Sequence, residues 1–426
     1  MNRRAPFLLI LIAVAACNRA PELPVKPPVK PPVNSAARKA PNDDSVPLAA
    51  SIPDIDGDNL LNLAYGAALV SRTGEMNLES SALHAIDGLS FSSWSSSPAA
   101  PEQTLVFSLG AVSRIEQLGV TTASKDQSPA KVRFAASSDG QSWRDVVTIE
   151  PAGKGTTMKG VTPFEARYLR VETLEPSQYY AVLTSVHAIG SEVRPPERHS
   201  FGGCWSINTF DATLVQNGAR ITGILGGVKQ PTYVDGGIDG RVAKLMWIHG
   251  PMWGYAAATL TADGRNISAI TFHEEPIFQN FGQAWIGSRC DENAPRSNAA
   301  NASSPLTPAD YLRRIGRWTM AGIVFDQQDH LIEEPSVATL DAAAALINAA
   351  PKQRFRIIAQ EFRSNDANDN RRRTKARVDA VRAALLTRRV DVSRIEFLGN
   401  GSERKDVEMP SAIQRMLWSR VDLEQK

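Results

Sequence analysis

The feature that most constrains the fold is a change of hydrophobic period near residue 311. Before it, short segments with apolar residues at every second position recur between Gly, Asn and Pro turns, a pattern typical of half-buried strands. After it, strand-like segments alternate with segments whose apolar residues recur every three or four positions. Neither one continuous sheet nor one helical bundle fits both patterns. The sequence therefore predicts a multidomain chain in which β modules precede an α/β module.

Length and charge narrow the class of protein further. A chain of 426 residues suits two to four domains of ordinary size. The net charge of +2 is too small to give the surface a strong positive potential that would attract nucleic acid. We therefore expect no nucleic-acid partner. The apolar fraction of 42% is that of ordinary globular proteins and is sufficient for packed cores.

The first residues are typical of an export signal. Arginines at positions 3 and 4 precede an apolar run at 7–14 and small residues at 15–16. That run is too short to span a bilayer, which takes about 20 residues. Residues 14–17, VAAC, resemble the lipobox of bacterial lipoproteins. The resemblance implies a signal peptide at 1–16 and a lipid anchor on Cys17. The residue after the cysteine is Asn18, and not the aspartate that retains such proteins at the inner membrane. The resemblance therefore also implies an outer-membrane location facing the periplasm. The alternative is an ordinary secretory signal with an incidental cysteine.

A tether is predicted between the anchor and the first module, over residues 17–58. Its PVKPPVKPPV repeat at 24–33 favours polyproline II, because proline fixes φ and has no N–H. We expect a semi-rigid spacer.

Residues 59–192 are predicted to form a β-sandwich. Strands are expected at 105–110, 115–123, 131–137, 143–149 and 166–173. The ordered motifs AIDG (85–88), SSWSS (92–96), SSDGQSWRDV (137–146) and ARYLRV (166–171) resemble the discoidin, or coagulation-factor type C, domain. The resemblance implies a jelly roll that binds glycans or other surface ligands through loops at one end.

Three aromatic residues of this module are candidate glycan contacts. Tyr179 and Tyr180 follow a Pro-Ser turn, and Trp94 lies beside the AIDG motif. Aromatic rings stack on apolar sugar faces, but packing in the core is the alternative for Trp94 and a plain surface role for the tyrosines. The resemblance also implies a structural calcium near Asp87, although Ser185 stands where the second acid is expected. We otherwise expect no cofactor.

Residues 197–291 are predicted to form a β-meander or small barrel. Asn217-Gly218 and Asp263-Gly264 are strong hairpin signals, and sequential pairing is the simplest topology. Cys204 and Cys290 open and close this segment, and an even pair in an exported chain favours a disulfide over two free thiols. His249 and His273 have no metal-ligand spacing, so we interpret them as structural or solvent-facing.

An Asn-, Ala-, Ser- and Pro-rich linker at 292–310 precedes the α/β module at 311–426. Strands are expected at 318–326, 354–360, 394–399 and 419–423, with one helix capped by Ser336 and a basic helix at about 370–387. Phe325-Asp326, Asn370, Thr374, Arg377, Gly399 and Arg420-Val421-Asp422 resemble the OmpA-like domain. That resemblance implies an association with peptidoglycan.

The resemblance assigns Arg377 to the peptide stem of peptidoglycan, with Asn370 on the same helix. Asp366 or Asp369 would take the place of the family aspartate that is missing here. Phe362 stands where the family has a ligand-binding aspartate, and Glu361 would point elsewhere if it continued the strand. Arg377 lies along the apolar face of its helix, so it needs a carboxylate. A ligand, or an internal partner such as Asp326 or Asp379, would provide it.

No nucleophile–base pair, phosphate loop or metal motif is recognisable in the sequence. We therefore expect a non-enzymatic outer-membrane lipoprotein that binds peptidoglycan and either a glycan or an envelope protein. The alternatives are an accessory envelope glycan hydrolase with the middle module as catalyst, and an assembly or display protein that does not bind the wall.

Overall fold

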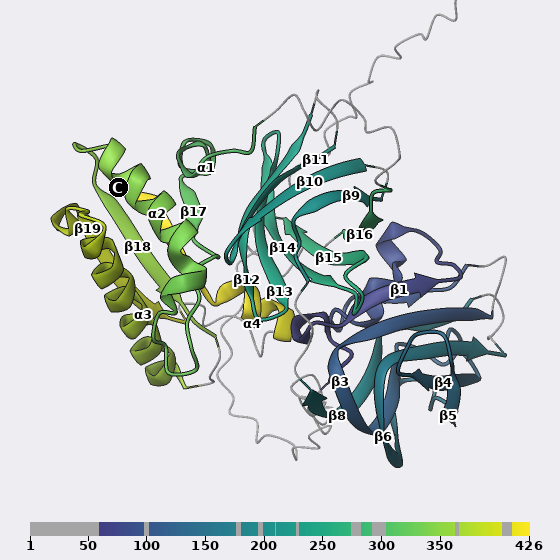
Figure 1. The fold of residues 1–426 in the computed structure, drawn as a ribbon. Helices are drawn as coiled ribbons and strands as arrows, with labels where there is room; N and C mark the ends of the chain where they lie inside the picture. The colour runs from purple at the N-terminus through teal and green to yellow at the C-terminus, as the bar shows by residue number, and fades with distance from the viewer. Residues whose placement is uncertain are drawn as a thin grey trace, which may run out of the picture. The chain divides into compact units, whose positions relative to one another are not determined.

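The computed structural model describes residues 59–97, 102–175, 180–194, 199–208, 210–226, 230–273, 283–291, 304–362, 366–402 and 411–426. It confirms a multidomain chain made of a β-sandwich module, a closed barrel and a module of helices and strands (Figure 1). The leader, Cys17 and the proline-rich tether lie outside the described residues. None of the helices in the described part of the chain is both long and apolar enough to cross a membrane.

The first module is built on two long antiparallel strands, β3 and β6, of 20 residues each. Two segments expected as separate strands belong to β3, which carries irregularities of register between Ser108 and Ser113 and between Ile115 and Gln117. Such bulges bend a strand without ending it. The main sheet has the order β1-β3-β6-β4-β5 with β8 on β3, and β2 pairs with β7. The bounds are β1 (Ala68–Arg72), β2 (Trp94–Ser95), β3 (Gln103–Thr122), β4 (Lys131–Ser137), β5 (Arg144–Ile149), β6 (Gly155–Leu174), β7 (Val182–Leu183), β8 (Ser185–Arg194), and the short 3-10 turns η2 (Leu63–Tyr65), η3 (Leu78–Ser80) and η4 (Ala82–Ala85).

The middle module is an eight-stranded antiparallel barrel in which each strand pairs with the next and the last pairs with the first. Gly218 and Gly264 adopt positive φ values of 58° and 67° at the two predicted hairpins, a conformation that favours glycine. Pairing of Ile207 with Gly287 closes the barrel, so the predicted meander has no open edge among its described strands. The bounds are β9 (Gly203–Ile207), β10 (Phe210–Asn217), β11 (Arg220–Leu225), β12 (Thr232–Asp239), β13 (Val242–His249), β14 (Met252–Leu260), β15 (Asn266–His273) and β16 (Ala284–Arg289).

Cys204 and Cys290 form the predicted disulfide, with their Cα atoms 5.4 Å apart. It lies beside the seam between β9 and β16, where Cys290 N also donates to Cys204 O at 3.2 Å. The covalent bond and the strand pairing therefore join the same two ends of the barrel.

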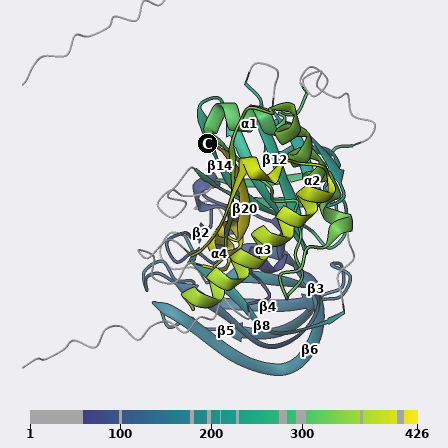
Figure 2. The same ribbon diagram turned by 90° about the vertical axis from the view of Figure 1, so that its left-hand side faces the viewer.

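The third module has a four-stranded sheet of order β17-β20-β18-β19, in which β18 and β19 are parallel. Helix α3 packs on β18 and β19, and Figure 2 shows α2 and α3 side by side. The strand expected at 318–326 is wrong for most of its length, because β17 ends at Thr319. The bounds are α1 (Pro308–Ile315), β17 (Arg317–Thr319), α2 (Glu333–Ala349), β18 (Phe355–Gln360), α3 (Ala367–Thr387), η6 (Val392–Arg394), β19 (Ile395–Gly401), α4 (Ala412–Trp418) and β20 (Arg420–Gln425).

The expected Ser336 cap is also wrong. Helix α2 begins at Glu333, and Ser336 lies inside its first turns. The Ser336 hydroxyl donates to Ile332 O at 2.7 Å and accepts from Val324 N at 2.9 Å. It therefore ties the preceding loop to the helix and leaves the helix terminus uncapped by a side chain.

Candidate functional site

Arg377 lies on α3 with only 7% of its side chain exposed. Its Nε donates to Asp329 Oδ1 at 2.8 Å, and its Nη2 forms an ion pair with Glu361 Oε2 at 2.5 Å. Arg373 Nη1 also donates to Asp329, at 2.7 Å, and the Arg377 guanidinium lies 5.1 Å from the ring centroid of Phe325. The internal partners are therefore Asp329 and Glu361, and the expected partners Asp326 and Asp379 were wrong.

The inward turn of Glu361 corrects a second expectation. Strand β18 ends at Gln360, so the alternation of side chains does not extend to Glu361, which is fully buried. Its carboxylate accepts from Phe362 N at 2.9 Å and from the Ser419 hydroxyl. Phe362, at the position of the family aspartate, packs on Trp418 with the ring centroids 4.5 Å apart. This position is filled by an apolar ring.

The other two residues assigned to peptidoglycan lie on the same helix. Asp366 is the N-cap of α3 and accepts from Asn368 N at 2.9 Å. Asn370 is buried, and its carbonyl accepts from the Thr374 hydroxyl at 3.0 Å. The candidate site on α3 therefore consists of the exposed carboxylate of Asp366, the buried amide of Asn370 and the buried, ion-paired guanidinium of Arg377.

In the first module, the structure separates the three candidate glycan contacts. Trp94 is fully buried, and its indole N–H donates to Gly74 O at 3.3 Å, so it offers no ring face to a sugar and that assignment is corrected. Tyr180 is partly buried, and its hydroxyl accepts from Gln127 Nε2 at 3.1 Å. Val182 N donates to Gln127 O at 2.8 Å, which holds the loop of Gln127 beside Tyr180. Tyr179 lies outside the described residues.

The surroundings of Asp87 do not fit a calcium ion. The fully buried carboxylate accepts from Leu89 N at 2.9 Å, from the Ser92 hydroxyl at 2.8 Å and from His84 Nδ1 at 2.8 Å. Burial raises the pKa of Asp87, although its hydrogen bond and charge interaction with His84 act in the opposite direction. Hydrogen-bond donors surround this carboxylate, whereas calcium requires a shell of oxygen ligands. The expectation of calcium at Asp87 is therefore wrong.

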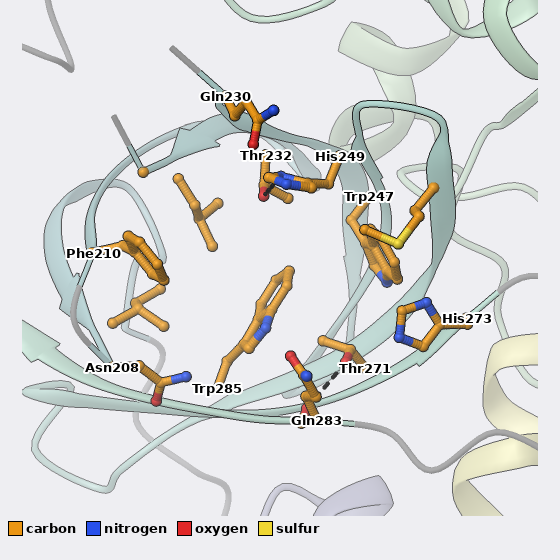
Figure 3. Close-up of a pocket in the computed structure, with 14 residues that line it drawn as sticks. Asn208, Phe210, Gln230, Thr232, Trp247, His249, Thr271, His273, Gln283 and Trp285 are labelled. Atoms are coloured by element: carbon orange, nitrogen blue, oxygen red, sulfur yellow. Dashed lines mark hydrogen bonds between the residues drawn. The ribbon is translucent and has the colours of Figure 1, made fainter. Parts of the chain in front are cut away.

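The barrel contains a cavity that the sequence did not indicate, with a volume of about 400 Å³ (Figure 3). His249 and His273, which we interpreted as structural or solvent-facing, both line it. They are the last residues of β13 and β15. In an antiparallel meander, alternate strands run in the same direction, so their last residues reach the same rim. The position of each histidine at the end of a strand, two strands apart in the meander, was the signal available in the sequence.

Comparisons with known proteins identify two of the three modules. Residues 70–186 match the model of the F5/8 type C domain, and residues 324–415 match the model of the OmpA family. No curated protein matches the chain.

Solved structures similar to this chain include carbohydrate-binding modules. The family 32 carbohydrate-binding module of Streptococcus pneumoniae EndoD is 11% identical, covers 31% of this chain and 99% of its own, and has a TM-score of 0.28. The family 32 module of Clostridium perfringens NanJ, solved with galactose, is 16% identical, covers 30% and 97%, and has a TM-score of 0.28. Chitosan-binding module 1 of a Paenibacillus chitosanase/glucanase is 21% identical, covers 30% and 98%, and has a TM-score of 0.27.

Proposed function

We propose that this chain is a non-enzymatic protein of the bacterial cell envelope, held at the outer membrane by lipid on Cys17. Its first module binds a glycan, and its third module associates with peptidoglycan. The observation that carries the proposal is the presence in one chain of an F5/8 type C match and an OmpA family match, on separate modules. The export signal and the VAAC motif support the location.

For the glycan, the proposed contacts are Tyr179, Tyr180 and the neighbouring Gln127. An aromatic ring stacks on the apolar face of a sugar, while an amide supplies donors and acceptors for hydroxyl groups. Tyr180→Phe keeps the ring and loses the hydroxyl, whereas Tyr180→Ala loses both. On a glycan array, the proposal expects binding that Tyr180→Phe largely keeps and Tyr180→Ala abolishes; equal binding by both variants would contradict it.

For the wall, Arg377 needs its carboxylate partners to move before it can bind a carboxylate of the peptide stem. Asp366, the N-cap of α3, and Asn370, on its first turn, are the proposed flanking contacts. Displacing Glu361 leaves a buried carboxylate unpaired, which is costly. Glu361→Gln removes that competing charge and keeps the shape of the side chain.

The test is sedimentation with purified sacculi of the mature chain, made soluble by Cys17→Ser. If Arg377 binds the stem, Glu361→Gln increases the pelleted fraction and Arg377→Lys decreases it. Arg382→Lys, an exposed change on the same helix, is the matched control and leaves pelleting unchanged. No pelleting of the parent chain would refute wall association, and unchanged pelleting of both site variants would refute the role of Arg377.

The second candidate function is protein assembly or display without wall binding. Two observations favour it: the guanidinium of Arg377 is occupied by Asp329 and Glu361, and the ring of Phe362 is packed on Trp418. Under this function the parent chain stays in the supernatant of the sacculus assay. We do not propose the hydrolase alternative, because glycoside hydrolysis uses two facing carboxylates, and the described polar side chains lining the barrel cavity are those of His, Asn, Gln and Thr.

A further inference from the structure

We propose that the barrel cavity binds an uncharged, ring-bearing, largely apolar small molecule. Every strand from β9 to β16 contributes at least one residue to its lining, so the cavity is one end of the barrel lumen. Its volume of about 400 Å³ falls within the range of about 300 to 1,000 Å³ typical of small-molecule sites. The closed ladder and the disulfide hold the walls in place, which lowers the entropic cost of binding.

Aromatic rings form much of the wall. Figure 3 shows Trp285 projecting into the middle of the cavity, with Phe210 on one side of it and Trp247 on the other. The Trp247 ring meets His273 edge-on, with the centroids 5.1 Å apart. Aromatic walls favour flat partners in offset-stacked or edge-to-face arrangements. This geometry points to a ring system in the ligand.

Several polar atoms of the wall already have partners within the protein. Asn208 Nδ2 donates to Ala284 O at 3.1 Å, and its Oδ1 accepts from Ile286 N at 3.1 Å. The Thr271 hydroxyl donates to Gln283 O at 3.1 Å. The Thr232 hydroxyl and His249 Nδ1 share a hydrogen bond of 3.0 Å. These pairs reduce the number of polar atoms left to bind the hydroxyl groups of a sugar, so a mainly apolar ligand fits the described wall better.

The described lining also indicates that the ligand is neutral. None of its fourteen residues, all within the described part of the chain, is Asp, Glu, Lys or Arg. A charged ligand would lose its hydration there and would gain no partner of opposite charge from the described lining. At the rim, Phe210 and Met252 expose 57% and 48% of their surfaces, and a ligand seated in the mouth would cover apolar area there.

The experiment uses two fluorescent probes with the same ring framework. N-phenyl-1-naphthylamine is neutral, and 8-anilino-1-naphthalenesulfonate adds a fixed negative charge. Each is titrated into the mature chain carrying Cys17→Ser, with calorimetry to give the stoichiometry. The proposal expects saturable one-to-one binding of the neutral probe and affinity for the sulfonate at least tenfold lower. No saturable binding of the neutral probe, or equal affinity for both probes, would overturn it.

Two variants assign that binding to the cavity. Phe210→Ala removes an exposed rim ring, and Trp285→Leu removes the central ring; each is expected to weaken binding by about threefold to tenfold, the value of one aromatic contact. Val215→Ala is the matched control, because Val215 lies on β10 with Phe210, is 53% exposed and does not line the cavity. Circular dichroism checks that Trp285→Leu is folded. Unchanged binding of the neutral probe by Phe210→Ala overturns the proposal, even if Trp285→Leu does not fold. Tighter binding of 1-dodecanol, which has no ring, than of the neutral probe overturns the inference that the ligand carries a ring.

Discussion

At the scale of single residues, Arg377 shows what a sequence pattern can and cannot predict. Its place on the apolar face of a helix was enough to require a carboxylate. The two carboxylates that pair with it come from separate loops: Asp329 precedes Arg377 by 48 positions, and Glu361 follows the end of β18. The sequence pattern could not identify them. The family position filled by Phe362 was recognised, but its packing on Trp418 was not.

The first prediction concerns the stability that this charge provides. Arg377→Ala removes the positive charge that pairs with Glu361 and one of the two arginines that pair with Asp329, in a buried site. We expect the free energy of unfolding to fall by about 3 to 5 kcal/mol, as when one member of a buried ion pair is removed. Urea denaturation followed by tryptophan fluorescence measures it. The control is Arg372→Ala, because the Arg372 side chain is 78% exposed; this variant should lose no more than about 0.5 kcal/mol of unfolding free energy. Equal losses in the two variants would contradict the stabilisation of the buried carboxylates by Arg377.

The second prediction concerns His187 in the first module. Burial lowers the pKa of His187 from 6.5 to about 4. Its ring shares hydrogen bonds with Thr121 and Asn59, at 2.7 Å and 3.4 Å. Between these two pKa values the unfolded chain binds a proton that the folded chain does not, so stability is full above pH 6.5 and falls as the pH drops towards 4.

The expected loss is about 3 kcal/mol across that range. It is measured by urea denaturation at pH 7.5, 6, 5 and 4. His187→Gln cannot titrate, and its unfolding free energy should fall less over the same range. Parallel curves for the two proteins would show that other groups cause the acid dependence.

At the scale of elements, alternation and turn signals predicted the strands and hairpins of the barrel well. They did not predict that both faces of some strands are buried. Along β13, Leu245 and Trp247 belong to the core inside the barrel, whereas Met246 and Ile248 belong to the core outside it. Strands buried on both faces lose the clean alternation of apolar and polar residues.

The third prediction tests the closure of the barrel. The double variant Cys204→Ser/Cys290→Ser removes a crosslink with a sequence separation of 86. The chain-entropy model then gives a loss of about 4 to 5 kcal/mol in the free energy of unfolding. Because β9 and β16 remain hydrogen-bonded, we expect the far-ultraviolet circular dichroism to be unchanged at low denaturant. A barrel that unfolds without denaturant would show that the strand seam alone cannot close it.

At the scale of the whole molecule, the described residues between 59 and 426 belong to one compact unit. The Thr259 hydroxyl of the barrel donates to Ala67 O of the first module at 2.8 Å. Ala219 N of the barrel donates to Pro335 O of the third module at 2.9 Å. The sequence indicated a linker between the barrel and the third module, at 292–310. The contacts between modules join residues more than 100 positions apart and leave no local pattern in the sequence.

The fourth prediction concerns the attachment of the molecule. If Cys17 carries the lipid, Cys17→Ser moves the protein from the membrane fraction to the soluble periplasmic fraction, because the acyl chains provide the membrane affinity. Fractionation and immunoblotting measure the distribution. Asn18→Ala is the control and should remain with the membranes. A Cys17→Ser protein that still sediments with membranes would refute lipidation as the main attachment.

The sequence by itself determined the order and class of the modules, the hairpins of the barrel, the cysteine pair and the need of Arg377 for a carboxylate. These follow from periodicity, turn chemistry and the cost of burying a charge, which act locally along the chain. Only the tertiary structure decided which carboxylates neutralise Arg377, that Trp94 is buried, and that His249 and His273 meet at a cavity. Those outcomes depend on which distant segments pack together, and a residue type at one position carries no information about its neighbours in space.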